Sequence, residues 1–351
     1  MTALAIREDV PLAPLTTLGV GGPARWFVKA GDEAVVIAAH AWARARGVSL
    51  RVLGGGSNVV VADAGVDALV VHLALRGVDA RRVDGAVEVT AAAGEPWDAL
   101  VESTVEREWA GLECLSGIPG LVGATPIQNV GAYGQEVSDT VTAVRALDTE
   151  AGRVATLPAA ACGFAYRDSA FKRDAPGRWV VLGVTYRLRP GGSPTLGYAE
   201  VERHLARHGG APTLRAVRQA VLTIRRGKSM VLDDPADPNR RSCGSFFLNP
   251  IVEATDAAAV ATRAADAAMP RWPQPDGRVK LSAAWLIERA GFARGQRTGP
   301  VGLSTRHTLA IVAHDEARTD DVLAFARRVQ EGVESRFGVR LTPEPVLWGP
   351  A

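Results

Sequence analysis

Ser245 lies in a short motif that could be catalytic, but the usual partners of a nucleophilic serine are missing. Ser245 lies in residues 243–250, CGSFFLNP, between a glycine and two phenylalanines, and Asn-Pro closes the stretch as at the end of a local element. A nucleophilic serine needs a base and a group that orients the base. No such set accompanies Ser245, and the chain contains neither an HExxH nor a GxSxG motif. The serine is therefore either structural or acts in another way.

Two glycine-rich stretches could bind a phosphorylated ligand. Residues 53–61, LGGGSNVVV, place three glycines and a Ser-Asn pair after an expected strand, and residues 116–135, SGIPGLVGATPIQNVGAYGQ, hold five more glycines. Glycine lets backbone N–H groups approach an anion without a Cβ in the way, and successive amides form a nest for phosphate oxygens. A tight hairpin explains the first stretch equally well. Both stretches together favour a long, dinucleotide-like cofactor.

Two further polar segments could bind or orient an anionic substrate. Residues 164–172, FAYRDSAFK, place Arg167 beside a tyrosine, and arginine beside aromatics is typical of carboxylate or phosphate recognition. Residues 341–349, LTPEPVLWG, hold Glu344 between two prolines that restrict its position. The alternative interpretations are a surface ion-pair cluster for the first segment and an exposed loop carboxylate for the second.

Two other patterns are better explained as ordinary structure. Residues 19–24, GVGGPA, fit Gly-x-Gly-x-x-Ala, but a dinucleotide loop must follow a strand and open a helix, and prolines surround this one. A plain turn is the favoured interpretation. His204 and His208 are four residues apart on an expected helix, as a metal pair would be, yet their charged neighbours favour a solvated helix face. We expect no metal.

Composition limits the class of protein. With 351 residues the chain can form two or three domains, and 47% hydrophobic and 22% charged residues are typical of a globular protein. A net charge of +2 argues against a nucleic-acid scaffold. Three scattered cysteines build neither a disulfide framework nor a metal knuckle. No signal peptide or membrane span is recognisable. We expect a soluble, cytoplasmic monomer with no nucleic-acid or membrane partner.

Hydrophobic periodicity predicts the elements that position these residues, in a mixed α and β pattern. Asp32 is an expected helix N-cap, Gly47 lies past that helix, and Pro96 lies near the start of the next one. Residues 190–194 and 227–242 are expected boundary loops. Helices are expected over residues 32–47, 94–109, 256–269 and 320–337, and strands over residues 178–190 and on both sides of the glycine turn in residues 50–65.

Five motifs, taken in order, resemble one enzyme family. GGGSN, SGIPGLVGATPIQNVGAYG, YRDSAFK, GSFFLNP and the terminal PE are similar to the UDP-N-acetylenolpyruvoylglucosamine reductases, flavoenzymes of bacterial peptidoglycan synthesis. Tyr198, in LGYAEV, resembles the substrate-capping tyrosine of their longer-loop, type I class. The resemblance implies an α+β fold, namely a two-subdomain FAD-binding fold of the vanillyl-alcohol-oxidase (PCMH) type plus a third, α+β substrate-binding domain. The implied parts are residues 1–75 completed by 338–351, residues 76–226, and residues 227–337 for the substrate.

The resemblance also assigns roles to residues. The implied catalytic set is Arg167, Ser245 and Glu344. Implied substrate contacts are Tyr166, Tyr198, Lys228, Asn249 and Gln296. Implied FAD contacts are Gly54, Gly55, Gly56, Ser57, Asn58, Ser116, Gly117, Ile118, Pro119, Gly120, Gly123, Ala124, Thr125, Gln128, Asn129, Gly131, Ala132, Tyr133 and Gly134.

Within this family the serine has a physical role. The resemblance implies that hydride passes from NADPH through FAD to the enolpyruvyl double bond of a UDP-sugar, which places negative charge on the adjacent carbon and its carboxylate. Such a carbanion is a strong base, so a neutral hydroxyl can protonate it. Ser245 would be this general acid, Arg167 would neutralise the carboxylate, and Glu344 would hydrogen-bond to the same oxygens.

Two other functions remain open from the sequence. A related FAD-dependent oxidase of another small molecule would keep the glycine loops without needing the Ser245–Glu344 pair. A non-catalytic sugar-nucleotide binding module would bind the substrate without flavin, and its preparation would be colourless.

Overall fold

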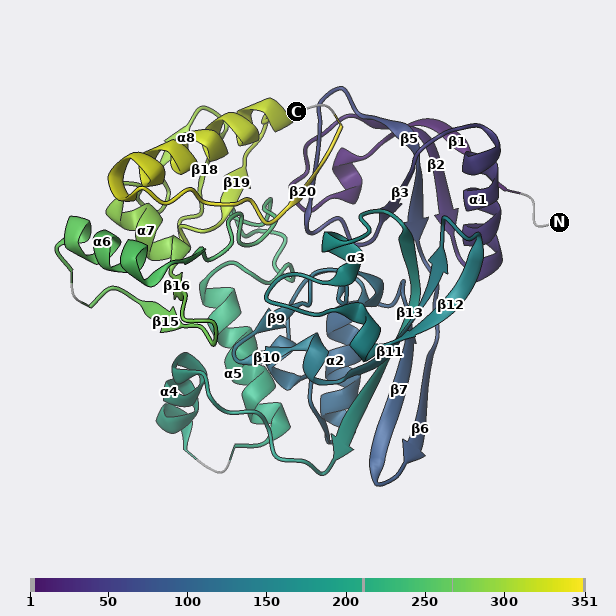
Figure 1. Ribbon diagram of the computed structural model, residues 1–351, viewed down its shortest axis with the longest axis horizontal. Helices are drawn as coiled ribbons and strands as arrows, with labels where there is room; N and C mark the ends of the chain where they lie inside the picture. The colour runs from purple at the N-terminus through teal and green to yellow at the C-terminus, as the bar shows by residue number, and fades with distance from the viewer. Residues whose placement is uncertain (1–3, 210–211, 267, 350–351) are drawn as a thin grey trace. The chain divides into compact units, whose positions relative to one another are not determined.

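The computed structural model describes residues 4–209, 212–266 and 268–349 (Figure 1). The chain divides into two compact units, and each is described by itself. Unit 2 takes over from unit 1 at Asp233, inside the loop over residues 227–242 that the sequence predicts as a boundary. Unit 1 comprises Met1–Val10, Ala24–Gly55 and Asp67–Leu232, and unit 2 comprises Pro11–Pro23, Gly56–Val66 and Asp233–Ala351.

A four-stranded sheet in the order β1-β2-β5-β3 opens unit 1, and α1 (Glu33–Ala45) packs against it (Figure 1). The side chain of Asp32 accepts a hydrogen bond from Val35 N at 2.8 Å, so the expected N-cap is confirmed. β3 and β5 run parallel. The strands are β1 Arg7–Pro11, β2 Pro23–Ala30, β3 Leu50–Leu53 and β5 Val66–Leu73.

The larger sheet of unit 1 has the order β12-β11-β13-β7-β6, and β8 also pairs with β13. β13 is the central strand and confirms the strand expected over residues 178–190. Helix α2 (Trp97–Glu106), whose N-cap is Pro96, packs its Trp97 ring 5.8 Å from that of Tyr186 on β13. The strands are β6 Val78–Val83, β7 Ala86–Ala92, β8 Trp109–Ala110, β11 Val141–Asp148, β12 Arg153–Pro158 and β13 Trp179–Pro190.

The rest of unit 1 consists of short elements and a helical pair. α4 and α5 are in contact, and α5 also packs on α2. A two-residue ladder joins β9 to β10. The elements are β9 Gly131–Ala132, β10 Gln135–Glu136, α3 Ala170–Arg173, α4 Ala199–His208 and α5 Leu214–Gly227, with 3₁₀ turns at Glu113–Leu115, Val122–Ala124, Val137–Asp139 and Ala159–Cys162.

Among the described residues of unit 2, three α-helices pack with three small sheets. β4 and β20 are parallel, and the other two sheets have the orders β14-β16-β15 and β17-β18-β19. Helix α8 carries the apolar residues Val322, Phe325, Val329, Val333 and Phe337 into the core, as its helical period predicts. The elements are the 3₁₀ turn Ala13–Leu15, β4 Val59–Val61, β14 Ile251–Val252, α6 Ala254–Ala264, β15 Arg271–Pro273, β16 Val279–Leu281, α7 Ala283–Arg289, β17 Arg297–Thr298, β18 Val301–Leu303, β19 Ile311–Ala313, α8 Thr319–Phe337 and β20 Val346–Trp348.

Two expectations from the sequence need correction. The helix expected over residues 256–269 ends at Ala264, because Ala265 adopts the left-handed conformation (φ 50°) that stops a helix. The hairpin interpretation of residues 53–61 is wrong, because β3 pairs with β5 whereas β4 pairs with β20. The dinucleotide interpretation of residues 19–24 is wrong, since this stretch leads into strand β2 and not into a helix.

In the part of the chain that the structure describes, no helix is both long enough and apolar enough to cross a membrane. Over the same residues, no group of three or more His, Cys, Asp or Glu side chains is arranged to hold a metal ion.

Candidate active site

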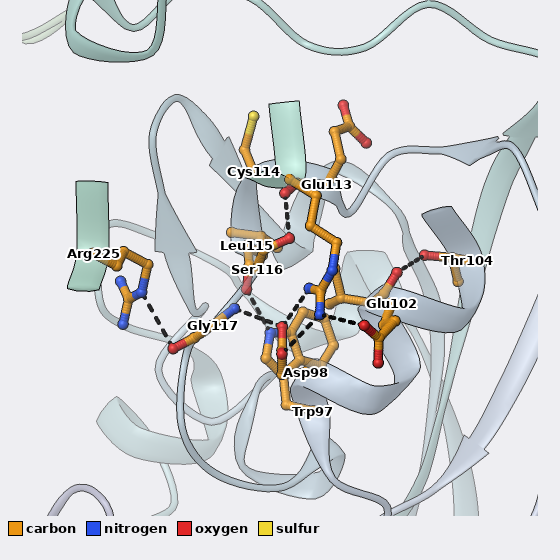
Figure 2. A network of polar contacts seen from close by, with 12 residues as sticks. Trp97, Asp98, Glu102, Thr104, Glu113, Cys114, Leu115, Ser116, Gly117 and Arg225 are labelled. Atoms are coloured by element: carbon orange, nitrogen blue, oxygen red, sulfur yellow. Dashed lines mark hydrogen bonds and ion pairs between the residues drawn. The ribbon is translucent and has the colours of Figure 1, made fainter. Parts of the chain in front are cut away.

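Near the start of the glycine loop over residues 116–134, the N–H and the C=O of Gly117 are hydrogen-bonded to side chains of two different helices (Figure 2). Gly117 N donates to Asp98 Oδ1 of α2 at 2.6 Å, and Arg225 Nε of α5 donates to Gly117 O at 3.2 Å. Arg218 of α5 in turn donates to both oxygens of Asp98, at 2.6 and 3.0 Å. Burial alone would raise the pKa of Asp98, but hydrogen bonds from Arg218 and Gly117 lower it below its ordinary value.

Two hydroxyl groups of this loop donate to main-chain carbonyls a few residues away. Ser116 Oγ donates to Glu113 O at 2.7 Å, and Thr125 Oγ1 donates to Val122 O at 2.8 Å. Both hydroxyls lie on buried residues. These two hydroxyls are therefore committed to bonds within the protein.

The two glycine loops approach each other at backbone distance. A Cβ added at Gly55 would lie 2.9 Å from the Cα of Gly120, and a Cβ at Gly123 would lie 2.6 Å from the Cβ of Ala93. A side chain is thus excluded at Gly55 and at Gly123, and we call the stretch that these two glycines share with Gly120 the glycine cradle. The residues present fit a cofactor that main-chain groups hold at its diphosphate, as FAD would be held.

Arg167 lies in a tight turn against the same loop. Ala165 and Asp168 exchange two backbone hydrogen bonds, of 3.0 and 3.1 Å, and Arg167 between them has the left-handed φ of 53°. Its Nη2 donates to Gly131 O at 2.5 Å, and a Cβ added at Gly131 would lie 3.0 Å from its Nη1. Gly131 therefore leaves room for the guanidinium, which also lies 5.5 Å from the centre of the Tyr166 ring.

Three residues with predicted ligand roles form one cluster in unit 1. The rings of Tyr133 and Tyr198 meet edge to face with centroids 5.2 Å apart, and Lys228 Nζ lies 5.8 Å from the Tyr133 ring centre. Lys228 also pairs with Glu200 at 2.6 Å. Tyr198 is 41% exposed. Burial raises the pKa of Tyr133 to about 12, so its hydroxyl is neutral at physiological pH.

In unit 2 the segments of Ser245 and Glu344 lie side by side. Glu344 N donates to Phe246 O at 2.9 Å, and Phe247 forms a bridge with Pro343. Among the described residues of this unit, the Ser245 hydroxyl has no hydrogen-bond partner, so no histidine in it activates the serine as a nucleophile. This environment leaves the hydroxyl proton available.

Asn58, from the first glycine-rich stretch, contacts the segment that carries Glu344. Asn58 Nδ2 donates to Glu344 O at 3.4 Å, and Asn58 O accepts from Val346 N at 3.0 Å. Cys243 is buried nearby: burial first, and then the charge of Glu344, raise the pKa of its thiol to about 12. Cys243 is therefore a protonated thiol at neutral pH.

The amide oxygens of two predicted substrate residues bind backbone in unit 2. Asn249 Oδ1 accepts from Ala283 N, at the start of α7, at 2.9 Å. Gln296 Oε1 accepts from Ala293 N at 2.9 Å.

Sequence reasoning missed the residues that brace the loop from α2 and α5. Arg225 is only 9% exposed and also donates from Nη2 to Met230 O at 2.7 Å. A signal for it was present: Arg218 and Arg225 are seven residues apart on the buried face of α5, where apolar residues are expected.

Comparison with known proteins defines the class first. Residues 24–158 match the FAD binding domain family, and residues 235–348 match the family described as UDP-N-acetylenolpyruvoylglucosamine reductase, C-terminal domain. With the α+β fold and the glycine cradle, these matches make the chain an FAD-dependent oxidoreductase, and they confirm the predicted flavin-binding fold.

Full-length relatives give the family. The chain is 53% identical to the UDP-N-acetylenolpyruvoylglucosamine reductase of Saccharopolyspora erythraea, over 96% of this chain and 94% of the relative. It is 49% identical to that of Thermobifida fusca, over 97% and 98%. The crystal structure of the reductase from Thermus caldophilus aligns with a TM-score of 0.66 and 28% identity, over 99% of this chain and 100% of the other. The chain belongs to the UDP-N-acetylenolpyruvoylglucosamine reductase family.

Proposed function

We propose that this protein reduces the enolpyruvyl group of UDP-N-acetylglucosamine enolpyruvate, which yields UDP-N-acetylmuramate, with NADPH as the reductant. The reaction would be a step of peptidoglycan synthesis in the cytoplasm. When bound, FAD supplies the hydride that the double bond receives. The relatives of about 50% identity across the whole chain support this proposal.

In the proposed reaction, the protein's own residues bind the substrate and supply a proton. Arg167 binds the substrate carboxylate and neutralises the charge that builds on it, and Glu344 hydrogen-bonds to the same oxygens. Ser245 holds the proton at Oγ and gives it to the carbon beside the carboxylate. The single observation that supports this role best is that, among the described residues of unit 2, the Ser245 hydroxyl has no partner of its own.

The remaining predicted residues complete the proposal. The glycine loops would bind FAD through their main chain, Tyr198 would cap the substrate, and Lys228 would be a further substrate contact. Tyr166, Asn249 and Gln296 would be further substrate contacts. In domain terms, residues 1–75 with 338–351 and residues 76–226 would bind FAD, and residues 227–337 the substrate. The active protein would be a monomer.

Stopped-flow absorbance of the two half-reactions tests the role of Ser245. In Ser245→Ala, reduction of the flavin by NADPH should keep its rate, whereas reoxidation by the enolpyruvyl substrate should slow roughly 100- to 10,000-fold, because a general acid is lost. Equal slowing of both half-reactions would contradict the assignment. So would undiminished entry of solvent deuterium at the lactyl α-carbon of the product.

The same instrument separates this function from that of a flavin oxidase. The reduced protein should react far faster with the enolpyruvyl sugar nucleotide than with dissolved oxygen. Rapid reoxidation by oxygen alone, with no response to the sugar nucleotide, would favour an oxidase of another small molecule. A colourless preparation that binds the sugar nucleotide would favour the non-catalytic module.

A further inference from the structure

The turn that carries Arg167 is fastened to the cofactor loop at three successive places. Ser169 Oγ donates to Ile127 O at 2.5 Å, and Asn129 Nδ2 donates to Ala165 O at 3.1 Å. Arg167, which lies between Ala165 and Ser169 in the chain, donates from its guanidinium to Gly131 O. The two segments are far apart in the sequence, yet each end of the turn and its central side chain are bonded to one stretch of five residues.

The Ser169 side chain bonds to Ile127 O and does not cap the helix that follows it. It is the N-cap residue of α3, a position where a serine side chain usually accepts a hydrogen bond from the helix backbone. Here the side chain makes no capping bond, and its hydroxyl donates instead to a carbonyl 42 residues away. The residue is 0% exposed, so water cannot replace that bond. The hydroxyl is thus committed to the contact between the turn and the loop.

Asn129 is held in place by the protein on every side. It is 1% exposed and has the left-handed φ of 44°, which asparagine tolerates better than most residues. Its Oδ1 accepts from Ser138 N at 3.1 Å, and its Nδ2 donates to Glu136 Oε2 at 2.7 Å as well as to Ala165 O. With these three bonds the side chain serves the loop and the turn.

The turn itself needs such support. Arg167 has a left-handed backbone conformation that a long side chain rarely adopts and that persists only where the surroundings impose it. Lys172 Nζ donates to Arg167 O at 3.1 Å and adds a contact from α3. Strain of this kind is typical of residues whose side chain must point in one direction.

We propose that Ser169 and Asn129 are positioning residues for Arg167, fixing its turn on the loop so that the guanidinium meets the substrate carboxylate in one orientation. Asn129, predicted from the sequence as an FAD contact, would then act mainly on the substrate side. The proposal rests on the proposed function of Arg167. A misplacement of about 1 Å in such a group can cost roughly 100-fold in rate.

The first test compares Ser169→Ala with a matched loss of a buried hydroxyl elsewhere. Thr104→Val on α2 removes a buried hydroxyl that also donates to a backbone carbonyl, Val101 O at 2.8 Å, away from the turn. Reoxidation of the reduced flavin by the substrate should slow about tenfold or more in Ser169→Ala and not in Thr104→Val. Flavin reduction by NADPH should stay the same in both. Asn129→Gly, which accepts the left-handed backbone, should also slow reoxidation by the substrate.

A double-mutant cycle shows whether the effect passes through Arg167. Arg167→Lys should slow the substrate half-reaction by itself, and adding Ser169→Ala to it should slow the reaction less than about twofold further. An equal loss from Ser169→Ala in both backgrounds would overturn the positioning role. If Arg167→Lys left the half-reaction unchanged, the proposed function of Arg167 would be wrong, and the positioning role of Ser169 with it.

A readout without flavin completes the test. In the apoprotein, the Asp168 amide, which donates to Ala165 O, should exchange with deuterium faster in Ser169→Ala than in the wild type or in Thr104→Val. Unchanged exchange together with a slowed half-reaction would mean that the hydroxyl does not act by fixing the turn, and this would overturn the proposal.

Discussion

In the glycine cradle, the effect of replacing a single glycine depends on which atoms lie at its Cβ position. Gly55 approaches the main chain of Gly120, and no rotation of a side chain could relieve the clash that a methyl group would create there. Gly31 differs: nothing lies within 4 Å of its Cβ position and its φ is not positive. The two positions therefore separate the effect of close backbone approach from the general effect of adding a methyl group.

We expect Gly55→Ala to weaken FAD binding about tenfold or more, because overpacking costs roughly 1–3 kcal/mol and the cost falls where the two loops meet. The measurement is the flavin content of the purified protein, followed by titration of the apoprotein with FAD. Gly31→Ala should bind FAD like the wild type. Equal FAD affinity of Gly55→Ala and the wild type would show that the two loops can separate without loss.

At the scale of elements, a buried carboxylate joins the segment before the cofactor loop to the segment before Tyr198. Glu113 is 0% exposed and lies in the 3₁₀ turn that packs on α2 and α5. Its oxygens accept from Gly111 N at 2.8 Å, Gln135 Nε2 at 2.9 Å and Thr195 N at 2.7 Å. Three N–H donors satisfy the charge without a cation.

Glu113→Gln should destabilise the protein by about 2 kcal/mol, because an amide NH₂ would face at least one N–H group that now donates to an oxygen. The same change should raise KM for the substrate more than it lowers kcat, since Thr195 lies three residues before Tyr198. Urea unfolding and steady-state kinetics measure the two effects. Glu106→Gln, on an exposed position of α2, is the control and should match the wild type in both.

At the scale of the whole molecule, three buried thiols link stability to pH. Burial raises the pKa of Cys114 to about 12 and that of Cys162 to about 11, and burial followed by the charge of Glu344 raises that of Cys243 to about 12. Their ordinary pKa is 9.0. Above pH 9 the unfolded chain releases these protons while the folded protein keeps them. This stabilisation is therefore complete below pH 9 and is lost as the pH rises towards 12.

Between pH 8 and pH 10, the wild type should lose about 1 kcal/mol of unfolding free energy per thiol more than a variant with alanine at Cys114, Cys162 and Cys243. Urea unfolding at the two pH values measures the difference. The comparison between proteins removes the contribution of lysines and tyrosines, which both proteins share. Identical losses in the two proteins would contradict the raised pKa values.

Local sequence signals predicted elements where the stop and start residues were strong. Asp32 as an N-cap and the apolar period of residues 320–337 gave α1 and α8 as they stand in the structure. The end of α6 was missed because the alanine-rich run contains no residue that typically ends a helix. Ala265 adopts the left-handed conformation there, and no glycine marks the position in the sequence. The partners of β3 and β4 were missed as well, since strand pairing with distant segments leaves no trace next to the strand.

The sequence by itself determined the family of this protein, because five motifs in fixed order and full-length identity to known relatives need no coordinates. It also showed where glycines gather, in residues 53–61 and 116–135. Only the tertiary structure decided what the polar side chains of those motifs do: Asn129 and Ser169 bond to segments about forty residues away, and Asn58 bonds to the main chain of Glu344. The physical reason is that a hydrogen bond depends on atoms within about 3 Å of each other, and spacing along the chain does not record which distant atoms folding brings to that distance.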